Sequence, residues 1–404
     1  ASFTAVSGNG YFVNTTSSAI TVTLPAGSAG DIVGISDYAS TFQTNNVTIA
    51  PNGSDNINGI NENATLSTQG LAVSLVYVDS TRGWKSVTGS DNDTTGTLPF
   101  IQATGGTITT CGDFKIHTFT GPGTFTVSSS SPCSTNNTFD YLVVAGGGSG
   151  GGDRGGGGGG GGFRYFLNTT SAPTACAPGA PLNGYGSPTP SGTAITASIQ
   201  SYPITVGGGG AASSGGQRGN QGSSSIFSTV TSAGGGSGGG CQGSPTPGGN
   251  GGSGGGARDS AGATAGSGNT PPVTPSQGQD GGASPASNNR AAGGGGAIAA
   301  GGVGAPGGDG AGGNGAGIPT KLAGSAGETC GSFQFFSGGG EGGSNSTGST
   351  GGGGLGGGGD RGPGQSGVGG AGTANTGGGS AGNNNNADDG NSGGSGIVII
   401  RYKY

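Results

Sequence analysis

The sequence predicts a mainly β protein without significant α-helix, in which a β-sandwich or jelly-roll-like domain precedes a sandwich of polyglycine II helices bracketed by β-strands. Three observations lead to this fold class. Short strands with alternating apolar residues recur over residues 1–95. Over residues 141–162 an apolar strand runs directly into almost pure glycine, and at the end of the chain glycine runs into Ile397–Ile400. A flexible linker needs no apolar strand at either end, so we expect the glycine region to be folded.

The bulk composition excludes several classes of protein. The 404 residues include 107 Gly and 20 Pro, a level at which aperiodic sequences are often disordered. Only 7% of the residues are charged, however, whereas disordered chains usually carry many charges. The 12 Lys and Arg residues are scattered singly, so we expect no nucleic-acid partner. No apolar run is long enough to cross a bilayer, so we expect no membrane span.

Residues 1–95 are expected to form an independent β-sandwich or jelly-roll-like head. Apolar residues alternate with threonine or serine over residues 20–24 and 71–75, which is typical of half-buried strands. Further short strands are separated by turn clusters at intervals of roughly 8 to 12 residues, the spacing of a sandwich. Trp84 follows the last strong strand, and we expect it in the core or at a contact between chains.

Residues 96–106 are expected to link this head to a second domain, residues 107–404, which opens with a β-hairpin over residues 111–133. The glycines and proline of residues 120–124 would form the turn of the hairpin.

The cysteines support this hairpin. Cys111 and Cys133 each lie eleven residues from Pro122, so they would face each other across antiparallel strands and could form a disulfide. Cys176, Cys241 and Cys330 remain, and we expect one pair and one free thiol among them. Their spacing matches no zinc pattern.

The glycine region, residues 146–396, is predicted to consist of polyglycine II helices. Glycine does not recur strictly at every third position, which excludes collagen, and an α-helix would cost about 1 kcal/mol per glycine. The extended left-handed helix with about three residues per turn and ~3.1 Å per residue remains. Its backbone N–H and C=O groups point outward and need neighbours, so several such helices would form a slab. A closing strand over residues 396–402 is also expected, and it should pair in one sheet with the apolar strand at residues 141–145. We further expect a long loop over residues 255–290.

The order of motifs in the second domain resembles the glycine-rich domain of bacteriophage tail-fibre and appendage proteins. The motifs are FKIHTFTGPGTFTV, DYLVVAGGGSGGG, SYPITVGGGGA, repeated GGGxGGG runs and GGSGIVIIRY, and they cover about residues 107–404. Such domains are similar to the tip adhesins of T-even-type long tail fibres. The resemblance implies a sandwich of polyglycine helices in a virion appendage whose loops touch the host surface. The head also resembles β domains placed upstream of such tips.

The sequence favours recognition over catalysis. Gly-x-Gly-x-x-Gly matches occur throughout because glycine is abundant, so they indicate no nucleotide site. His117 is the sole histidine and is expected to be an ordinary strand residue rather than a general base. The polar run at residues 383–390 lacks the spacing of an EF-hand loop. We therefore expect a structural or adhesive protein that is not an enzyme and holds no cofactor or metal.

Loops between rigid elements usually carry binding residues. Two groups of side chains in the inserts are candidates for contact with a receptor or a neighbouring subunit. The first is aromatic and basic (Arg154, Phe163, Arg164, Tyr165 and Phe166), and the second is aromatic (Phe333, Phe335 and Phe336). Within them, Arg164, Tyr165, Phe333, Phe335 and Phe336 are expected to form the contact. The alternative is that these aromatic residues pack against the edges of the slab, as its only large apolar side chains. The expected partners are copies of the chain itself and a host-surface glycan or protein.

A second hypothesis is that the protein is a secreted, self-assembling subunit of an extracellular filament, and that this subunit is glycosylated. Its candidate glycosylation sites are the sequons that begin at Asn14, Asn46, Asn52, Asn63, Asn92, Asn136, Asn168 and Asn345. Serine and threonine are abundant, so about this many sequons would arise by chance. The chain contains no methionine and starts at Ala1, which leaves processing or a longer parent chain open. Both hypotheses place the protein outside the cell, on a virion or in a filament.

Overall fold

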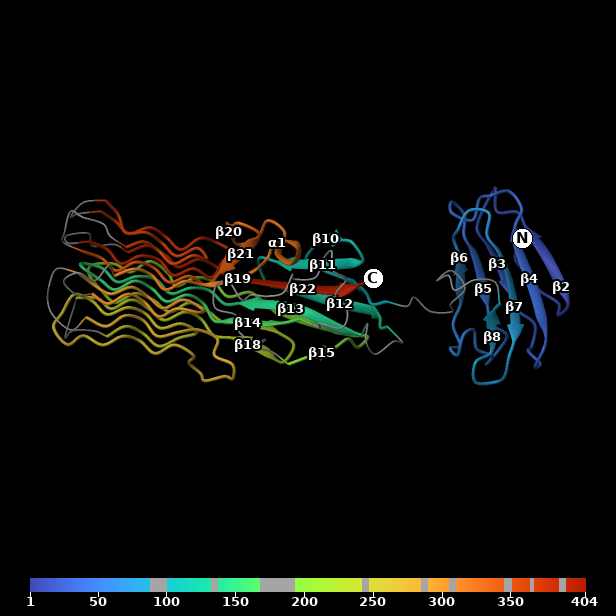
Figure 1. The fold of residues 1–404 in the computed structure, drawn as a ribbon, viewed down its shortest axis with the longest axis horizontal. Helices are drawn as coiled ribbons and strands as arrows, with labels where there is room; N and C mark the ends of the chain where they lie inside the picture. Colours follow the sequence, from blue (N-terminus) through green and yellow to red (C-terminus); the bar gives the residue numbers. More distant parts are fainter. Residues whose placement is uncertain are drawn as a thin grey trace. The chain divides into compact units, whose positions relative to one another are not determined.

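The computed structural model describes residues 1–87, 100–131, 137–167, 193–241, 247–284, 290–304, 310–344, 351–363, 367–384 and 390–404 (Figure 1). The mainly β prediction is confirmed: within the described ranges the only α-helix is the four-residue α1 (Thr320–Ala323). The chain divides into two compact units. The first unit comprises Ala1–Phe100 with Ser131–Ser134, and the second comprises Ile101–Ser130 with Thr135–Tyr404.

Two four-stranded sheets form the first unit. One sheet has the order β1 (Phe3–Thr4), β3 (Ile20–Thr23), β5 (Val47–Ala50) and β6 (Ala64–Leu66). The other has the order β2 (Asn9–Val13), β4 (Ile32–Asp37), β7 (Ala72–Tyr77) and β8 (Trp84–Ser86). Strands β1 to β5 alternate between the sheets, so the neighbours β1–β3, β3–β5 and β2–β4 are parallel.

The alternating residues of both sheets meet in one core, which makes the first unit a β-sandwich. Val22 and Ile49 of one sheet and Val33 and Leu75 of the other are buried in the same apolar cluster. Trp84 is completely buried there, with its ring 5.6 Å from that of Tyr77, so the expectation of a core tryptophan is confirmed.

Three sheets form one end of the second unit. The central sheet has the order β10 (Thr107–Cys111), β11 (Phe114–Phe119), β22 (Ile397–Lys403), β13 (Thr138–Val144) and β14 (Phe163–Phe166), and β15 (Ile195–Thr196) pairs with β13. A five-stranded sheet has the order β18 (Val230–Ser232), β17 (Ser225–Phe227), β16 (Ser201–Thr205), β12 (Gly123–Ser129) and β9 (Gln102–Thr104). A three-stranded sheet has the order β19 (Ala316–Pro319), β21 (Phe333–Phe336) and β20 (Glu328–Cys330).

The central sheet lies between the other two, which explains the continuous apolar runs in β13 and β22. Val143 and Val398 face the five-stranded sheet, whereas Val144 and Ile397 face the three-stranded sheet. Strands buried on both faces are apolar at nearly every position. The expected pairing of these two strands is confirmed, with Val144 opposite Ile397.

The predicted hairpin over residues 111–133 is wrong. Strand β11 pairs with β10 and β22 in the central sheet, whereas β12 pairs with β9 and β16 in the five-stranded sheet. The turn after β11 therefore carries the chain from one layer to the next, which lets Phe119 and Phe125 pack in the same core from opposite sheets. The disulfide inferred from this hairpin loses its geometric basis. Cys111 lies opposite Phe114 and has no disulfide partner among the described residues, and Cys133 lies outside them.

The glycine runs continue from the strands as a bundle of extended helices, as expected for polyglycine II (Figure 1). Residues 155–162, here called the central helix, show the pattern. Gly155, Gly158 and Gly161 donate to the carbonyl groups of Asn383, Ser380 and Gly377, so an antiparallel neighbour is met at every third residue. All N–H and C=O groups of the central helix are bonded in this way. The partners come from six segments, which are residues 145–151, 233–239, 253–256, 292–295, 337–343 and 377–383.

This hydrogen bonding requires glycine because the backbones touch. A Cβ atom added at any position from Gly155 to Gly162 would lie 2.0–2.5 Å from an oxygen atom of a neighbour. The predicted long loop over residues 255–290 is wrong in its described part. The N–H groups of Gly266 and Gly281 donate to the carbonyl groups of Gly255 and Gly266, so this segment belongs to the bundle. Small side chains also occur inside, and one of them replaces a backbone group: the Ser380 hydroxyl accepts from the N–H of Gly150 at 2.8 Å.

Candidate functional site at the tip of the glycine bundle

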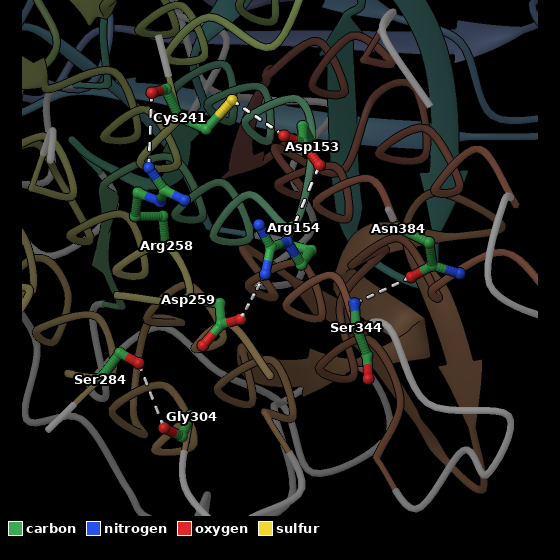
Figure 2. Close-up of polar contacts among 9 residues, drawn as sticks. All are labelled: Asp153, Arg154, Cys241, Arg258, Asp259, Ser284, Gly304, Ser344 and Asn384. Atoms are coloured by element: carbon green, nitrogen blue, oxygen red, sulfur yellow. Dashed lines mark hydrogen bonds and ion pairs between the residues drawn. The ribbon is translucent and has the colours of Figure 1, made fainter. Parts of the chain in front are cut away.

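The turns of the bundle that lie away from the sheets bring polar side chains together, and we call this region the tip. Its residues in Figure 2 are Asp153, Arg154, Cys241, Arg258, Asp259, Ser284, Gly304, Ser344 and Asn384. The positions follow from the hydrogen bonds of the central helix: Ala145 pairs with Gly162 beside the strands, whereas Gly151 pairs with Gly156 just before the turn.

At the tip, side chains form hydrogen bonds to the backbone groups of the turns, because these groups have no neighbouring helix. The N–H of Ser344 donates to Asn384 Oδ1 at 2.9 Å, and the Ser284 hydroxyl donates to the Gly304 carbonyl at 3.2 Å (Figure 2). Asn384 Nδ2 in turn donates to the Gly362 carbonyl at 2.9 Å. Buried backbone groups must be satisfied, so these side chains close the ends of the helices.

A charged turn lies at the centre of the tip. Asp153 and Arg154 have φ values of 45° and 56°, a left-handed conformation that costs energy for side chains larger than glycine. Two contacts to Asp259 hold this turn. Arg154 Nη1 donates to Asp259 Oδ2 at 3.3 Å, and the N–H of Asp259 donates to the Arg154 carbonyl at 3.1 Å. The Asp259 side chain is fully buried, whereas 27% of the Arg154 side chain is exposed.

Cys241 and Arg258 extend this network. Cys241 Sγ donates to Asp153 Oδ2 at 3.0 Å, and Arg258 Nη1 donates to the Cys241 carbonyl at 3.4 Å (Figure 2). Burial and the neighbouring Asp153 carboxylate raise the pKa of the Cys241 thiol. A protonated thiol is a poor nucleophile, so Cys241 is suited to a structural contact rather than to catalysis.

Several polar atoms of the tip have no hydrogen-bond partner among the described residues. They are Asp153 Oδ1, Arg154 Nε and Arg258 Nε, and all three are buried; the first two form an ion pair at 3.8 Å. Other parts of the Asp153, Arg154 and Arg258 side chains are partly exposed. No group of three His, Cys, Asp or Glu side chains that could hold a metal occurs in the described ranges. The tip therefore offers charged hydrogen-bonding groups to a partner.

The expected contact residues lie elsewhere. Tyr165, Phe335 and Phe336 are almost completely buried at the sheet end of the unit, so the prediction that they form a contact surface is wrong. Burial raises the pKa of Tyr165 to about 12. Arg164 and Phe333 are half-buried on β14 and β21. Glycine supplies no apolar side chain, so the few aromatic residues are used in the core, as the alternative interpretation held.

A signal for the tip was present in the sequence. Asp153-Arg154 and Arg258-Asp259 are adjacent opposite charges that interrupt two of the glycine runs. A charge cannot enter the bundle unpaired, so such a pair marks a turn.

His117 is buried and serves packing. Its Nδ1 bonds the Gly105 carbonyl at 2.7 Å, and its Nε2 bonds the Tyr402 hydroxyl at 3.0 Å. Burial lowers the pKa of His117. Both nitrogens are occupied within the fold, in agreement with the expected structural role.

The structure describes only some of the sequons and of the remaining cysteines. Asn14, Asn46 and Asn63 are exposed in the first unit and Asn52 is half-buried, whereas Asn92, Asn136, Asn168 and Asn345 lie outside the described residues. Cys241 and Cys330 are free thiols with respect to the described part of the chain. Cys176 lies outside it.

Within the described ranges, none of the helices has the length and apolar character needed to cross a membrane.

Comparison with known proteins identifies the family of the second unit. A search of curated proteins finds no match. A family profile described as a glycine-rich domain matches residues 118–403, which span β11 to β22 and the whole bundle between them. Over this range, which is well over half of its length, the chain belongs to the glycine-rich domain family.

Proposed function

We propose that the protein is a non-enzymatic, adhesive and structural subunit of an extracellular appendage, as in a phage tail fibre. In this proposal the tip contacts a glycan or protein on the host surface. The observation that carries it is the contrast between the central helix and the turns of the tip. The central helix excludes side chains, since even a Cβ atom in Gly155–Gly162 would meet a neighbouring oxygen. Variation in surface chemistry is therefore confined to the turns.

The charges of the tip suit recognition. Arg154, Arg258 and Asp153 are half-buried, so each has a fixed base and an exposed part. A charged group held in one orientation loses little conformational entropy when it binds. Hydrogen bonds that involve charged groups are also stronger than neutral ones. A rigid end with two partly exposed arginines is thus suited to a polar or anionic epitope.

The redox state of the cysteines distinguishes a virion protein from a secreted filament subunit. Cys111, Cys241 and Cys330 are free thiols in the described part of the chain. Free thiols are expected for proteins assembled in a reducing cytosol, whereas secreted proteins usually form disulfides. In the appendage the chain would also associate with copies of itself.

Immunogold electron microscopy of a culture that produces the protein tests the proposal. An antibody raised against the full chain should label the ends of fibres attached to particles. Label along filaments without particles would instead support the self-assembling filament. Label confined to the interior of cells would contradict both functions.

A further inference from the structure

A second candidate site lies at the sheet end of the second unit. A pocket of about 430 Å³ opens where the central sheet meets the segment after α1 and the turn at residues 373–376. Figure 1 shows α1 beside β10 and β11. The three-stranded sheet covers the face of β22 and β13 but does not extend over β10, and the uncovered face forms the floor of the pocket. This volume lies within the ~300–1,000 Å³ of small-molecule sites.

The register of the strands places hydroxyl groups on this floor. Thr107 lies opposite Thr118, and Thr109 lies opposite Ile116, so these four side chains share one face of the sheet. Ile397 continues the floor on β22, and Thr120 borders it. The floor therefore combines threonine hydroxyls with two isoleucine side chains. Where the same face is covered, it carries the apolar Ile399 and, next to Ile116, the buried Arg401.

These hydroxyl groups are available to bind a ligand. The side chains of Thr107, Thr109, Thr118 and Thr120 make no hydrogen bond to any described residue. Across the pocket, the turn residue Asn375 has a φ of 61° and is held by Ser395, whose hydroxyl accepts from the Asn375 N–H at 2.9 Å and donates to Asn375 Oδ1 at 3.2 Å. This contact orients the Asn375 side chain.

The charge of the pocket limits its ligands. None of the lining residues is Asp, Glu, Lys, Arg or His. An ionic ligand would meet no opposite charge among the lining residues, so phosphates and other ions gain no charge-assisted hydrogen bond there. A purely apolar ligand would leave the hydroxyls without hydrogen bonds. A ligand with many hydroxyl groups and an apolar face fits best, because each threonine can both donate and accept while the isoleucines contact C–H groups.

We propose that this pocket binds a neutral saccharide unit. The site is separate from the tip, so the proposal goes beyond the proposed function and does not depend on it. A peptide that adds to the exposed edge of β10 is a different occupant, and the position of a cross-link distinguishes the two.

Saturation-transfer NMR on the full chain, with the methyl glycosides of glucose, galactose, mannose and N-acetylglucosamine as probes, tests the proposal. At least one glycoside should receive magnetisation, and sialic acid, which is charged, should not. The double variant T107V/T109V keeps the shape of the side chains and should weaken binding about tenfold by removing two hydrogen-bonding groups. T110V on the opposite face of the same strand is the matched control and should bind as the native chain does.

A second measurement locates the site independently of these variants. A diazirine derivative of the bound glycoside should cross-link to residues 116–120 or 373–376. No transfer from any neutral glycoside, preference for sialic acid, or equal binding by T107V/T109V would overturn the proposal. Cross-links confined to the exposed edge of β10 or to the tip would overturn it as well.

Discussion

Asp140 and Arg401 lie directly opposite each other in β13 and β22, in the central sheet of the second unit. Arg401 donates to Asp140 Oδ2 from Nε at 2.9 Å and from Nη2 at 2.6 Å, and both side chains are buried. The guanidinium also lies over the ring of Phe114, 4.4 Å from its centroid. The pair thereby joins the strand that leads into the bundle to the strand that leaves it.

Removal of one member of this pair should be more harmful than removal of both. Arg401→Met leaves a buried carboxylate and should cost about 3–5 kcal/mol of unfolding free energy. Asp140→Leu combined with Arg401→Met removes both charges and should recover most of this loss. Chemical denaturation of the three proteins measures the difference. A double variant no more stable than the single one would contradict this account.

Substitutions in the bundle should lower stability at buried glycines and have little effect at exposed ones. A Cβ atom at Gly158 would lie 2.1 Å from the Gly148 carbonyl oxygen, so Gly158→Ala must push two helices apart. We expect a loss of about 3 kcal/mol or more. Gly208 has no atom within 4 Å of its Cβ position and is the matched control. Gly208→Ala should change stability by less than about 1 kcal/mol. Equal melting temperatures for the two variants would indicate a loose glycine region.

Acid should destabilise the second unit through His117. Burial lowers the pKa of His117 below its ordinary value of about 6.5. The unfolded chain therefore binds the proton more readily, and the stability that neutral His117 contributes is complete above pH ~6.5 and is lost as the pH falls toward the lower folded pKa. The native chain should lose up to about 1.4 kcal/mol per pH unit relative to His117→Gln. Parallel pH profiles of the two proteins would exclude this contribution.

The sequence predicted the parts of the fold that depend on local pattern. Strand alternation indicated the sandwich, and the apolar runs of β13 and β22 indicated their pairing, because both depend on short segments. The partner of β11 could not be predicted locally, since Phe114–Phe119 alternates equally well for a hairpin with β12 or for pairing with β22. Because β22 is buried on both faces within the central sheet, β11 pairs with β22 rather than with β12. Of the charged tip residues only Arg154 was among the candidates, because aromatic residues, most of which are in fact buried, were given more weight than charge pairs between glycine runs.

Phe336 stabilises the core of the second unit instead of forming a contact surface. Its ring is completely buried with Ile397 and Ile399. Phe336→Ala should therefore lower the unfolding free energy by about 3–5 kcal/mol, and any loss of attachment should accompany unfolding. Phe333→Ala, in the same strand but half-buried, is the matched control and should cost less. Thermal unfolding of the two variants measures this contrast, and a native melting temperature for Phe336→Ala would contradict the assignment to the core.

Attachment itself should depend on Arg258. Its Nη1 donates only a long hydrogen bond, 3.4 Å, to the Cys241 carbonyl, and its Nε has no partner among the described residues. The folded state therefore loses little when Arg258 is replaced by Ala, whereas a bound epitope loses a charged donor. A hydrogen bond to a charged group contributes about 1.5–3 kcal/mol, so binding of labelled protein to host cells should weaken at least about tenfold. Arg82→Ala, an exposed arginine of the first unit, should bind as the native chain does. Because exposed charges are screened by ions, added salt should reduce native binding more than that of Arg258→Ala. If Arg258→Ala, at native melting temperature, attaches as well as Arg82→Ala at low and high salt, the tip is not the surface that contacts the host.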